Sequence, residues 1–449
     1  MGQAHVLCVV AVLLASAPAW AQQKTQEEIE KEAMKERIKA LEDRMKSMPQ
    51  PGKDPEVSVT FKDGFKFKSA DGNFEGHIGG RALVHFRDIV DRHEDSNRTS
   101  TDQFFVRQAR LEATMTFWKD WEVKVQADFP TGASSTSGTL QDGFILWKRL
   151  PELNVRIGQF KEPFSQEEST PTRFIDFCER SVVNRLAPAR DIGIMVQGKL
   201  FDNMFEYELG AFNGAGRAVN DVNDEKELCA RLRVNPFVSS EDGSLFKGLR
   251  IGVSFSVQDV DSAGIDALDL TTTELAVKFL DATAGLIDGH RQRIGVELSW
   301  VHQSLSVRAE WAQRSDEVLL GASDVDIDVN GWYFAATWII TGEKKALENR
   351  LTPANPFDLS KGDWGAFELA VRVASLDGGD IIDELLASST LNAEKVTTIT
   401  VGINWWPTKN VRISPNFILE NYSDDVTFTG PVEQEDSVTG FIVRFQMDF

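Results

Sequence analysis

The chain has 449 residues, of which 42% are hydrophobic and 26% are charged, so it can bury a large apolar surface and is not disordered as a whole. Its 48 Lys and Arg residues against 69 Asp and Glu residues give a formal net charge of −21, which argues against nucleic acid as a partner because a phosphate backbone needs a basic face. The three cysteines, Cys8, Cys178 and Cys229, show no CxxC or CxxxC spacing, so we expect no thiolate metal site. The six histidines are scattered without paired ligand spacing, and we expect no other metal and no cofactor.

Residues 1–21 have the features of a secretory signal peptide. An apolar run from Val6 to Ala15 is followed by Ala-Trp-Ala at 19–21, a small-x-small cleavage site. The alternative, a short membrane anchor, is disfavoured because the run is too short to span a bilayer. Cleavage before Gln22 removes Cys8, and the sequence does not decide whether Cys178 and Cys229 pair.

No stretch of 18 apolar residues follows residue 21, which excludes a transmembrane helix in the mature chain. The only other structure that can span a bilayer is a closed β-barrel, because all its backbone groups are paired between strands. Barrels give no hydropathy peak, since lipid-facing and lumen-facing residues alternate along each strand.

Residues 22–50 are rich in Glu, Lys, Arg and Met and have helical periodicity. Met34, Ile38, Leu41, Met45 and Met48 are spaced 4, 3, 4 and 3 residues apart, which is an a/d seam of about two heptads. We expect a periplasmic coiled-coil helix that forms where an oligomer already holds the chains together, because so short a coil is marginal alone. The alternative is a solvated, partly frayed helix. Residues 51–73 are then a linker and a pre-barrel hairpin.

From residue 57 to the end the hydrophobic period is two, which indicates strands. In residues 121–129, for example, Trp, Val, Val, Ala and Phe alternate with Glu, Lys, Gln and Asp. The pattern predicts an all-β domain over 74–449, a sixteen-stranded antiparallel transmembrane β-barrel whose polar faces suit a water-filled lumen. The expected strands are 74–88, 103–118, 120–130, 140–148, 153–160, 192–201, 204–213, 226–235, 247–258, 290–301, 304–315, 330–341, 363–377, 395–406, 409–422 and 437–449. A weaker run at 271–280 is interpreted as loop.

The connections are of two kinds, as expected for a transmembrane barrel with short turns at one end and long loops at the other. Short turns occur near 119–120, 301–303 and 407–408. The long polar segments, all assigned to the opposite end, are 89–102, 161–190, 259–289, 342–362 and 378–394. Residues 441–449 alternate and end on Phe449, an ending typical of barrels that the outer-membrane assembly machinery recognises.

Several segments together resemble the phosphate-selective porin O and P family of Gram-negative outer membranes. The most specific are Phe-Val-Arg-Gln-Ala-Arg-Leu-Glu at 105–112, Lys-Asp-Trp at 119–121, Arg-Ile-Gly-Gln-Phe-Lys-Glu-Pro-Phe at 156–164 and Leu-Ala-Pro-Ala-Arg at 186–190. The resemblance runs from about residue 74 to 449. It implies a homotrimeric barrel in contact with outer-membrane lipid, and a long loop, here 161–190, that folds inward and narrows the pore.

The resemblance also implies rows of arginines in the lumen and lysines at the constriction in the phosphate-selective members. The arginines that the alternation places inside are Arg81, Arg110, Arg156, Arg231, Arg233, Arg293, Arg308, Arg372, Arg412 and Arg444. Carboxylates share the same faces, among them Glu112, Asp128, Glu297, Glu310 and Glu368. Two interpretations stay open: the arginines line an ion pathway, or they form arginine–carboxylate pairs that brace the wall.

The constriction loop departs from the family pattern at Glu168, where phosphate-selective members place a lysine. The loop residues that we expect to shape the pore are Lys161, Glu167, Glu168, Arg173, Arg180, Arg185 and Arg190. The sequence therefore predicts a channel with an anion or phosphate preference, while Glu168 puts phosphate specificity itself in doubt.

No nucleophile elbow, HExxH motif or P-loop occurs, so we do not expect an enzyme. The predicted function is a passive outer-membrane porin for small ions or hydrophilic solutes. The alternative is a barrel that acts mainly as an envelope tether through its periplasmic coiled coil.

Overall fold

The structure is a computed structural model. It describes residues 57–449 except 62, 91–101, 130–138, 220, 222–223, 265–267, 281–285, 322, 382–392 and 428–433, together with helical residues 31, 34, 35 and 37–39. The chain divides into two units, Met1–Val57 and Ser58–Phe449. The predicted signal peptide and most of the predicted coiled coil lie outside the described residues. Among those described, no helix is long and apolar enough to cross a membrane.

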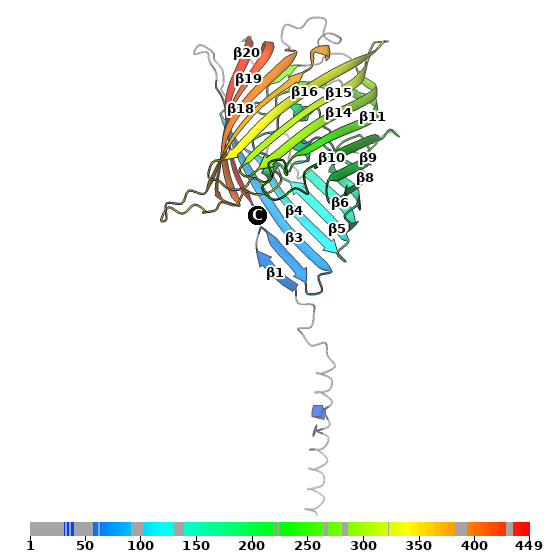
Figure 1. The fold of residues 1–449 in the computed structure, drawn as a ribbon. Helices are drawn as coiled ribbons and strands as arrows, with labels where there is room; N and C mark the ends of the chain where they lie inside the picture. The colour runs from blue at the N-terminus through cyan, green and yellow to red at the C-terminus, as the bar shows by residue number, and fades with distance from the viewer. Residues whose placement is uncertain are drawn as a thin grey trace, which may run out of the picture. The chain divides into compact units, whose positions relative to one another are not determined.

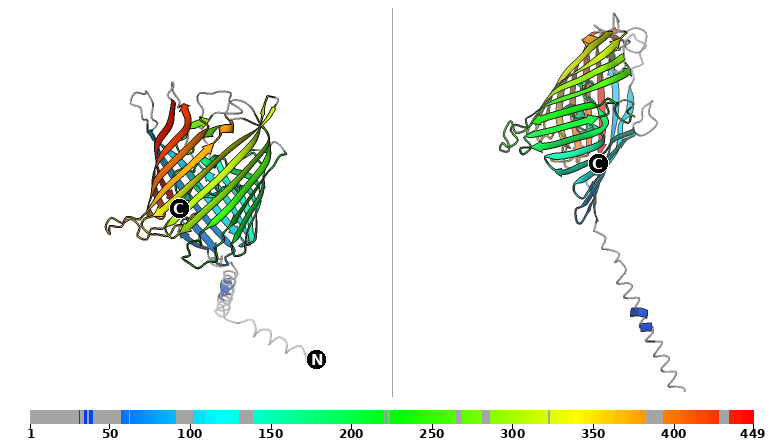
Figure 2. Two further views of the ribbon diagram at one scale, coloured as in Figure 1. Left: turned by 45° about the horizontal axis from the view of Figure 1, so that its top comes forward. Right: turned by 90° about the vertical axis from the view of Figure 1, so that its right-hand side faces the viewer.

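Sixteen strands of the described chain form one closed antiparallel sheet, which confirms the predicted fold (Figure 1). They are β3 (Phe74–Val90), β4 (Gln103–Phe117), β5 (Trp121–Asp128), β6 (Thr139–Leu150), β7 (Leu153–Lys161), β8 (Arg190–Leu200), β9 (Phe205–Phe212), β10 (Glu227–Val234), β11 (Arg250–Gly264), β14 (Leu286–His302), β15 (Leu305–Leu320), β16 (Ser323–Ile339), β17 (Ala366–Asp377), β18 (Lys395–Thr408), β19 (Val411–Thr427) and β20 (Gln434–Asp448). Each pairs with the next, and β20 pairs with β3, from Thr439 opposite Val90 to Asp448 opposite Arg81. Figure 2 shows the strands tilted around a common axis.

The apolar side chains of the strands face outward. On β18, Ile399, Val401 and Ile403 are exposed, whereas the alternate residues Thr400 and Asn404 are fully buried inside the barrel. The outward face would be costly in water, but it matches the hydrocarbon that surrounds a membrane barrel.

Small elements supplement the barrel. Strands β1 (Val57–Phe61) and β2 (Phe65–Ser69) pair with each other around Asp63 and Gly64, whose φ angles of 60° and 97° make the tight turn, and β2 also pairs with β3. Three short helices, α3 (Gln166–Ser169), η1 (Thr172–Phe174) and η2 (Val182–Arg185), lie in the connection between β7 and β8. The region predicted as loop at 271–280 contains a two-stranded sheet of β12 (Leu270–Thr271) and β13 (Lys278–Leu280).

One long connection lies at the end opposite to the predicted one. Because every strand reverses the chain direction, the end at which a connection lies depends on its place in the strand order and not on its length. The connection 340–365, between β16 and β17, therefore leaves from the same end as the short turns 118–120 and 409–410. The assignment of 342–362 to the long-loop end was wrong for this reason. We call these the short-turn end and the long-loop end.

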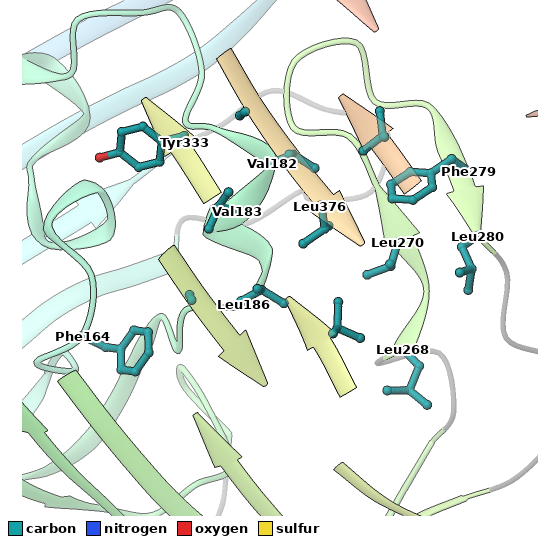
Figure 3. Packing of buried hydrophobic residues seen from close by; sticks show 14 of the residues in the cluster. Phe164, Val182, Val183, Leu186, Leu268, Leu270, Phe279, Leu280, Tyr333 and Leu376 are labelled. Carbon is teal, nitrogen blue, oxygen red and sulfur yellow. The ribbon is translucent and has the colours of Figure 1, made fainter. Parts of the chain in front are cut away.

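Part of the lumen is filled by an apolar core (Figure 3). The polar composition of the long loops did not predict this core. The core joins the β7–β8 loop, the β11–β14 loop and the barrel wall. Its members include Phe164, Val182, Val183 and Leu186 of the first loop, Leu268, Leu270, Phe279 and Leu280 of the second, and Tyr333 and Leu376 of the wall, each at most 4% exposed. A segment such as 268–280 is thus an inward plug and not an external loop.

Candidate functional site: the constriction of the barrel

The constriction loop, residues 161–190, is fixed at its tip by a wall carboxylate. The Glu310 carboxylate on β15 accepts the backbone N–H of Glu167 at 2.8 Å and that of Gln166 at 3.1 Å, and Tyr333 donates its hydroxyl to the same group at 2.7 Å. The first N–H groups of a helix have no intrahelical acceptor, so Glu310 satisfies the start of α3. The tip therefore rests against β15 and β16, across the lumen from β7.

Three of the predicted lumen arginines hold the backbone of this loop. Arg372 donates to the Glu167 carboxylate at 2.9 Å and to the Glu179 carbonyl at 3.1 Å. Arg412 donates to the Ile175 carbonyl at 2.8 Å, and Arg444 to the Thr172 carbonyl at 3.2 Å. All three side chains are at most 1% exposed. These arginines anchor the loop and are covered by it, so they are not offered to a passing solute.

Arg107 supplies a further anchor that sequence alternation missed. Its Nε and Nη2 donate to the two oxygens of Glu179 at 2.7 and 3.0 Å. Strict alternation would place Arg107 on the outward face with Ala109 and Leu111. A bulge in the β3–β4 pairing, between Leu83 and Val84, leaves Arg107 as an extra residue and re-aims its side chain inward.

Glu168, the residue at the expected lysine position, is neutralised inside the loop. Its carboxylate lies 3.2 Å from Lys161 Nζ and 3.4 Å from Arg180 Nε, and it accepts a hydrogen bond from Asn184 at 3.1 Å. Burial by itself would raise the pKa of Glu168, but the neighbouring cations, led by Arg180 and Lys161, lower that pKa to about 2. Glu168 is therefore ionised, paired and 5% exposed.

The remaining predicted loop residues divide between the pore and the plug. Arg173 and Arg190 line a cavity and pair with Glu112 at 2.8 Å and with Asp142 at 2.7 Å, respectively. Arg185 is exposed and donates to the Thr271 carbonyl at 2.9 Å, so it belongs to the contact between the two inward loops.

The cavity lies between the constriction loop and the wall formed by β3–β9, and its volume is about 230 Å³. Positive side chains outnumber negative ones among its described lining residues. The cations are Arg81, Arg110, Lys124, Arg156, Lys161, Arg173 and Arg190, and the carboxylates are Glu112, Asp142, Glu162 and Glu208. Lys124 was not among the predicted site residues, although its alternation with Val123 and Val125 places it on the lumen face.

Most of these cations are paired with a carboxylate, and two are not. Arg110 contacts Asp128 at 2.6 Å, and Lys124 contacts Asp142 at 3.3 Å. Among the described residues, neither Arg81 nor Arg156 has a carboxylate within 4 Å. Arg81 donates to the Gln108 side-chain carbonyl at 3.1 Å.

Arg156 is held by aromatic rings instead of a counter-charge. Its guanidinium carbon lies 4.7 Å from the ring centre of Phe144 and 5.1 Å from that of Phe160. The Nε atom has no hydrogen-bond partner among the described residues. A guanidinium held by ring faces keeps its hydrogen-bond donors available.

The other predicted lumen arginines pair with carboxylates outside this cavity, three of them within the wall and Arg308 with Asp176 of the constriction loop. The pairs are Arg231 with Glu297 at 2.8 Å, Arg233 with Glu206 at 2.8 Å, Arg293 with Glu227 at 2.6 Å and Arg308 with Asp176 at 3.9 Å. The pairing interpretation therefore applies to these four arginines, and the ion-pathway interpretation stays a prediction.

Two larger cavities adjoin the constriction. An outer cavity of about 500 Å³ lies at the long-loop end and shares Glu162 and Arg190 with it. An inner cavity of about 550 Å³ lies at the short-turn end and is lined by Glu206. Arg233 contacts both Glu206 of the inner cavity and Glu208 of the constriction cavity, at 2.8 and 3.8 Å. The inner cavity is therefore separated from the constriction cavity by the ion pairs of Arg233.

Cys178 and Cys229 are both buried free thiols. The first donates to the Ser414 carbonyl at 3.1 Å and the second to the Pro163 carbonyl at 3.4 Å. No group of metal-ligating side chains suited to an ion occurs among the described residues.

A family model described as phosphate-selective porin O and P matches residues 78–449, nearly the whole barrel. The chain belongs to this family. Porin O of Pseudomonas aeruginosa is 23% identical over 433 residues, which cover 88% of this chain and 93% of that protein.

The fold is also similar to solved structures of other bacterial proteins. The high-pH structure of OprB from Pseudomonas putida has a TM-score of 0.54 at 12% identity, over 83% of this chain and 94% of that one. A loop L8 deletion mutant of OmpT, an outer membrane protein of Vibrio cholerae, has a TM-score of 0.51 at 9% identity, over 84% and 100%.

Family membership and the closed barrel confirm the predicted class of function. The protein is an outer-membrane porin of the Gram-negative type, and its family and barrel point to a channel rather than an enzyme.

Proposed function

We propose that this porin prefers small anions and that Arg81 and Arg156 carry the preference. The observation that supports this most is that both line the 230 Å³ cavity without a carboxylate partner among the described residues. An ion that enters so narrow a space loses much of its water, and unpaired guanidinium groups replace that hydration for an anion but not for a cation.

Phosphate is one permeant of this class, because the family is described as phosphate-selective. The paired state of Glu168 supports weak retention: the carboxylate occupies Lys161 and Arg180, so these cations have less charge to offer to phosphate. We therefore propose general anion passage, with phosphate as a competing permeant.

The proposed path runs from the outer cavity through the constriction to the inner cavity, along the β3–β11 side of the barrel. The opposite side, next to β15–β20, is filled by the two inward loops. We assign the short-turn end to the periplasm, as bacterial barrels have short periplasmic turns.

The test is the reversal potential of the mature porin in a planar bilayer under a KCl gradient. We expect the sign of an anion-preferring channel, and a shift toward zero when Arg81→Gln and Arg156→Gln are combined. Arg185→Gln is the control for each of the two single variants, because it also removes one positive charge, from an exposed loop position. A cation-preferring wild type, or an unchanged potential in the double variant, would contradict the proposal.

The finer assembly is proposed on the sequence alone. The a/d seam within 22–50 supports a homotrimer with a periplasmic coiled coil, and Phe449 supports recognition by the barrel assembly machinery. Deleting 22–50 tests the first point: we expect a porin that still conducts but has a weakened trimer in light scattering. Loss of envelope integrity with no conductance in the wild type would favour the tether.

A further inference from the structure

The connection 340–365 crosses the short-turn mouth of the barrel beneath the filled part of the lumen (dark yellow, lower end of the barrel in Figure 1). The Lys345 backbone N–H donates to the Gln303 carbonyl at 2.8 Å, in the turn between β14 and β15. Five residues later, Arg350 contacts Asp448 at the end of β20 at 2.5 Å and Asp63 in the β1–β2 turn at 3.0 Å. This segment therefore spans from one side of the mouth to the other.

From this segment, one side chain reaches up to the constriction loop. Lys345 Nζ lies 2.5 Å from Asp176 Oδ1 and 2.5 Å from Glu368 Oε1, and its side chain is 8% exposed. Asp176 belongs to the loop that leaves from the long-loop end, whereas Lys345 belongs to a connection at the short-turn end. One ammonium thus ties together two connections from opposite faces of the barrel.

The surroundings of this ion pair make the lysine hard to replace. Asp176 and Glu368 are both buried, and the only other cation within 4 Å of either among the described residues is Arg308, at 3.9 Å from Asp176. A cavity of about 20 Å³, room for about one water molecule, adjoins all three side chains, and Lys345 also lines the inner cavity of about 550 Å³. Without the ammonium, two buried carboxylates would face each other, with Arg308 at 3.9 Å from Asp176 as the nearest described cation.

A displacement of Asp176 would also displace the loop residue Arg173, which lines the constriction cavity. Arg173 lies three residues earlier, within the η1 turn, and it is the loop cation that pairs with Glu112 across the constriction cavity. The carbonyl of Ile175, between them, is held by Arg412. The loop is therefore fixed on its wall side at the same few residues that place Arg173 on its pore side.

We propose that Lys345 is a positioning residue of the constriction: it holds the loop against the β15–β18 wall from the short-turn end and so sets the width of the pore at Arg173. The inference rests on the channel function of the cavity but not on its ion preference. A wild type without anion preference would leave it intact.

The test compares Lys345→Met with Lys344→Met in single-channel recordings. Lys344 is the exposed neighbour, so both variants lose the same charge at the same mouth, and only the first loses the contact. We expect Lys345→Met to replace the single conductance level by several levels. Lys344→Met should keep the single level, and Lys345→Arg should restore it, because a guanidinium can still bridge two carboxylates.

A second variant covers the case in which Lys345→Met does not assemble. Asp176→Asn combined with Lys345→Met removes the charge from both the loop and the connection, and we expect it to assemble and to show wider, less uniform openings. Uniform wild-type openings in either folded variant would overturn the proposal. An equal effect of Lys344→Met would also overturn it, because the cause would then be the charge of the mouth and not the position of the loop.

Discussion

Arginine has two roles in this barrel, and the partners of each side chain decide which role it has. Three arginines donate their hydrogen bonds to carboxylate and carbonyl groups of the constriction loop: Arg372, Arg412 and Arg444. Arg81 instead donates to an amide oxygen, and Arg156 packs on two aromatic rings. A buried arginine without a carboxylate keeps a net charge for a ligand, so the partner matters more than the residue type.

Glu162 offers a pH test of the same cavity. It lines both the constriction and the outer cavity, and its Oε2 has no hydrogen-bond partner among the described residues. Burial, followed by the nearby Glu227, raises the pKa of Glu162 well above the ordinary 4.5, while Arg293 opposes the shift. The carboxyl is therefore neutral at acid pH and gains its charge only as the pH rises through the raised pKa.

We predict that the anion preference falls as the pH increases above 4.5, because a negative charge then appears where the two cavities meet. The measurement is the reversal potential under a KCl gradient, with the pH equal on both sides of the bilayer and changed in steps. In Glu162→Gln the dependence should be absent, since the amide does not titrate. A pH dependence that is the same in this variant would assign the effect to another group.

At the scale of elements, the constriction loop is stabilised by the ion pairs of Glu168, which persist until the pH falls below 4.5. The pKa of Glu168 is about 2 in the folded chain against an ordinary 4.5. The stability that its pairing contributes is therefore present above pH 4.5 and is lost as the pH falls from 4.5 toward 2. We predict that the thermal unfolding midpoint declines as the pH falls below 4.5. Glu168→Gln should show a smaller decline; an equal one would contradict this account.

Restoring the family's lysine should not restore phosphate specificity in this chain. Glu168→Lys would place a third cation beside Lys161 and Arg180, in a position that is 5% exposed. We expect a loss of about 3 kcal/mol or more, typical of breaking a buried ion pair, measured as a lower midpoint of thermal unfolding. A stable variant whose current is blocked by low phosphate would contradict this expectation.

Period-two patterning predicted all sixteen barrel strands, because lipid and lumen impose opposite polarities on alternate residues. It failed where this local rule is broken. The bulge at Arg107 reverses the alternation, and nothing in Gln-Phe-Phe-Val-Arg-Gln marks its place. The Lys345–Asp176 contact joins residues 169 positions apart, a separation that no local pattern encodes.

As a whole molecule, the barrel is filled on one side and hollow on the other. The β11–β14 plug, the constriction loop and the connection 340–365 are linked in series by contacts such as Thr273 Oγ1 to the Arg180 carbonyl at 2.6 Å and Lys345 to Asp176. The sequence could not predict this asymmetry. The plug, residues 268–280, has only a weak strand pattern within a polar segment, and the loops that turn inward are identified only by their packing in the folded barrel.

The most direct test of this asymmetric path is the access of charged thiol reagents to cysteines on its two sides. Ser169 lines the constriction cavity, whereas Ser414 is fully buried on β19 behind the loop. Both changes to Cys are nearly isosteric, and the wild type with its two buried thiols gives the baseline. We predict that an anionic methanethiosulfonate reduces the current of Ser169→Cys, faster than a cationic one, and leaves Ser414→Cys unchanged. Block of Ser414→Cys alone, or faster reaction of the cationic reagent, would contradict an offset, anion-preferring pore.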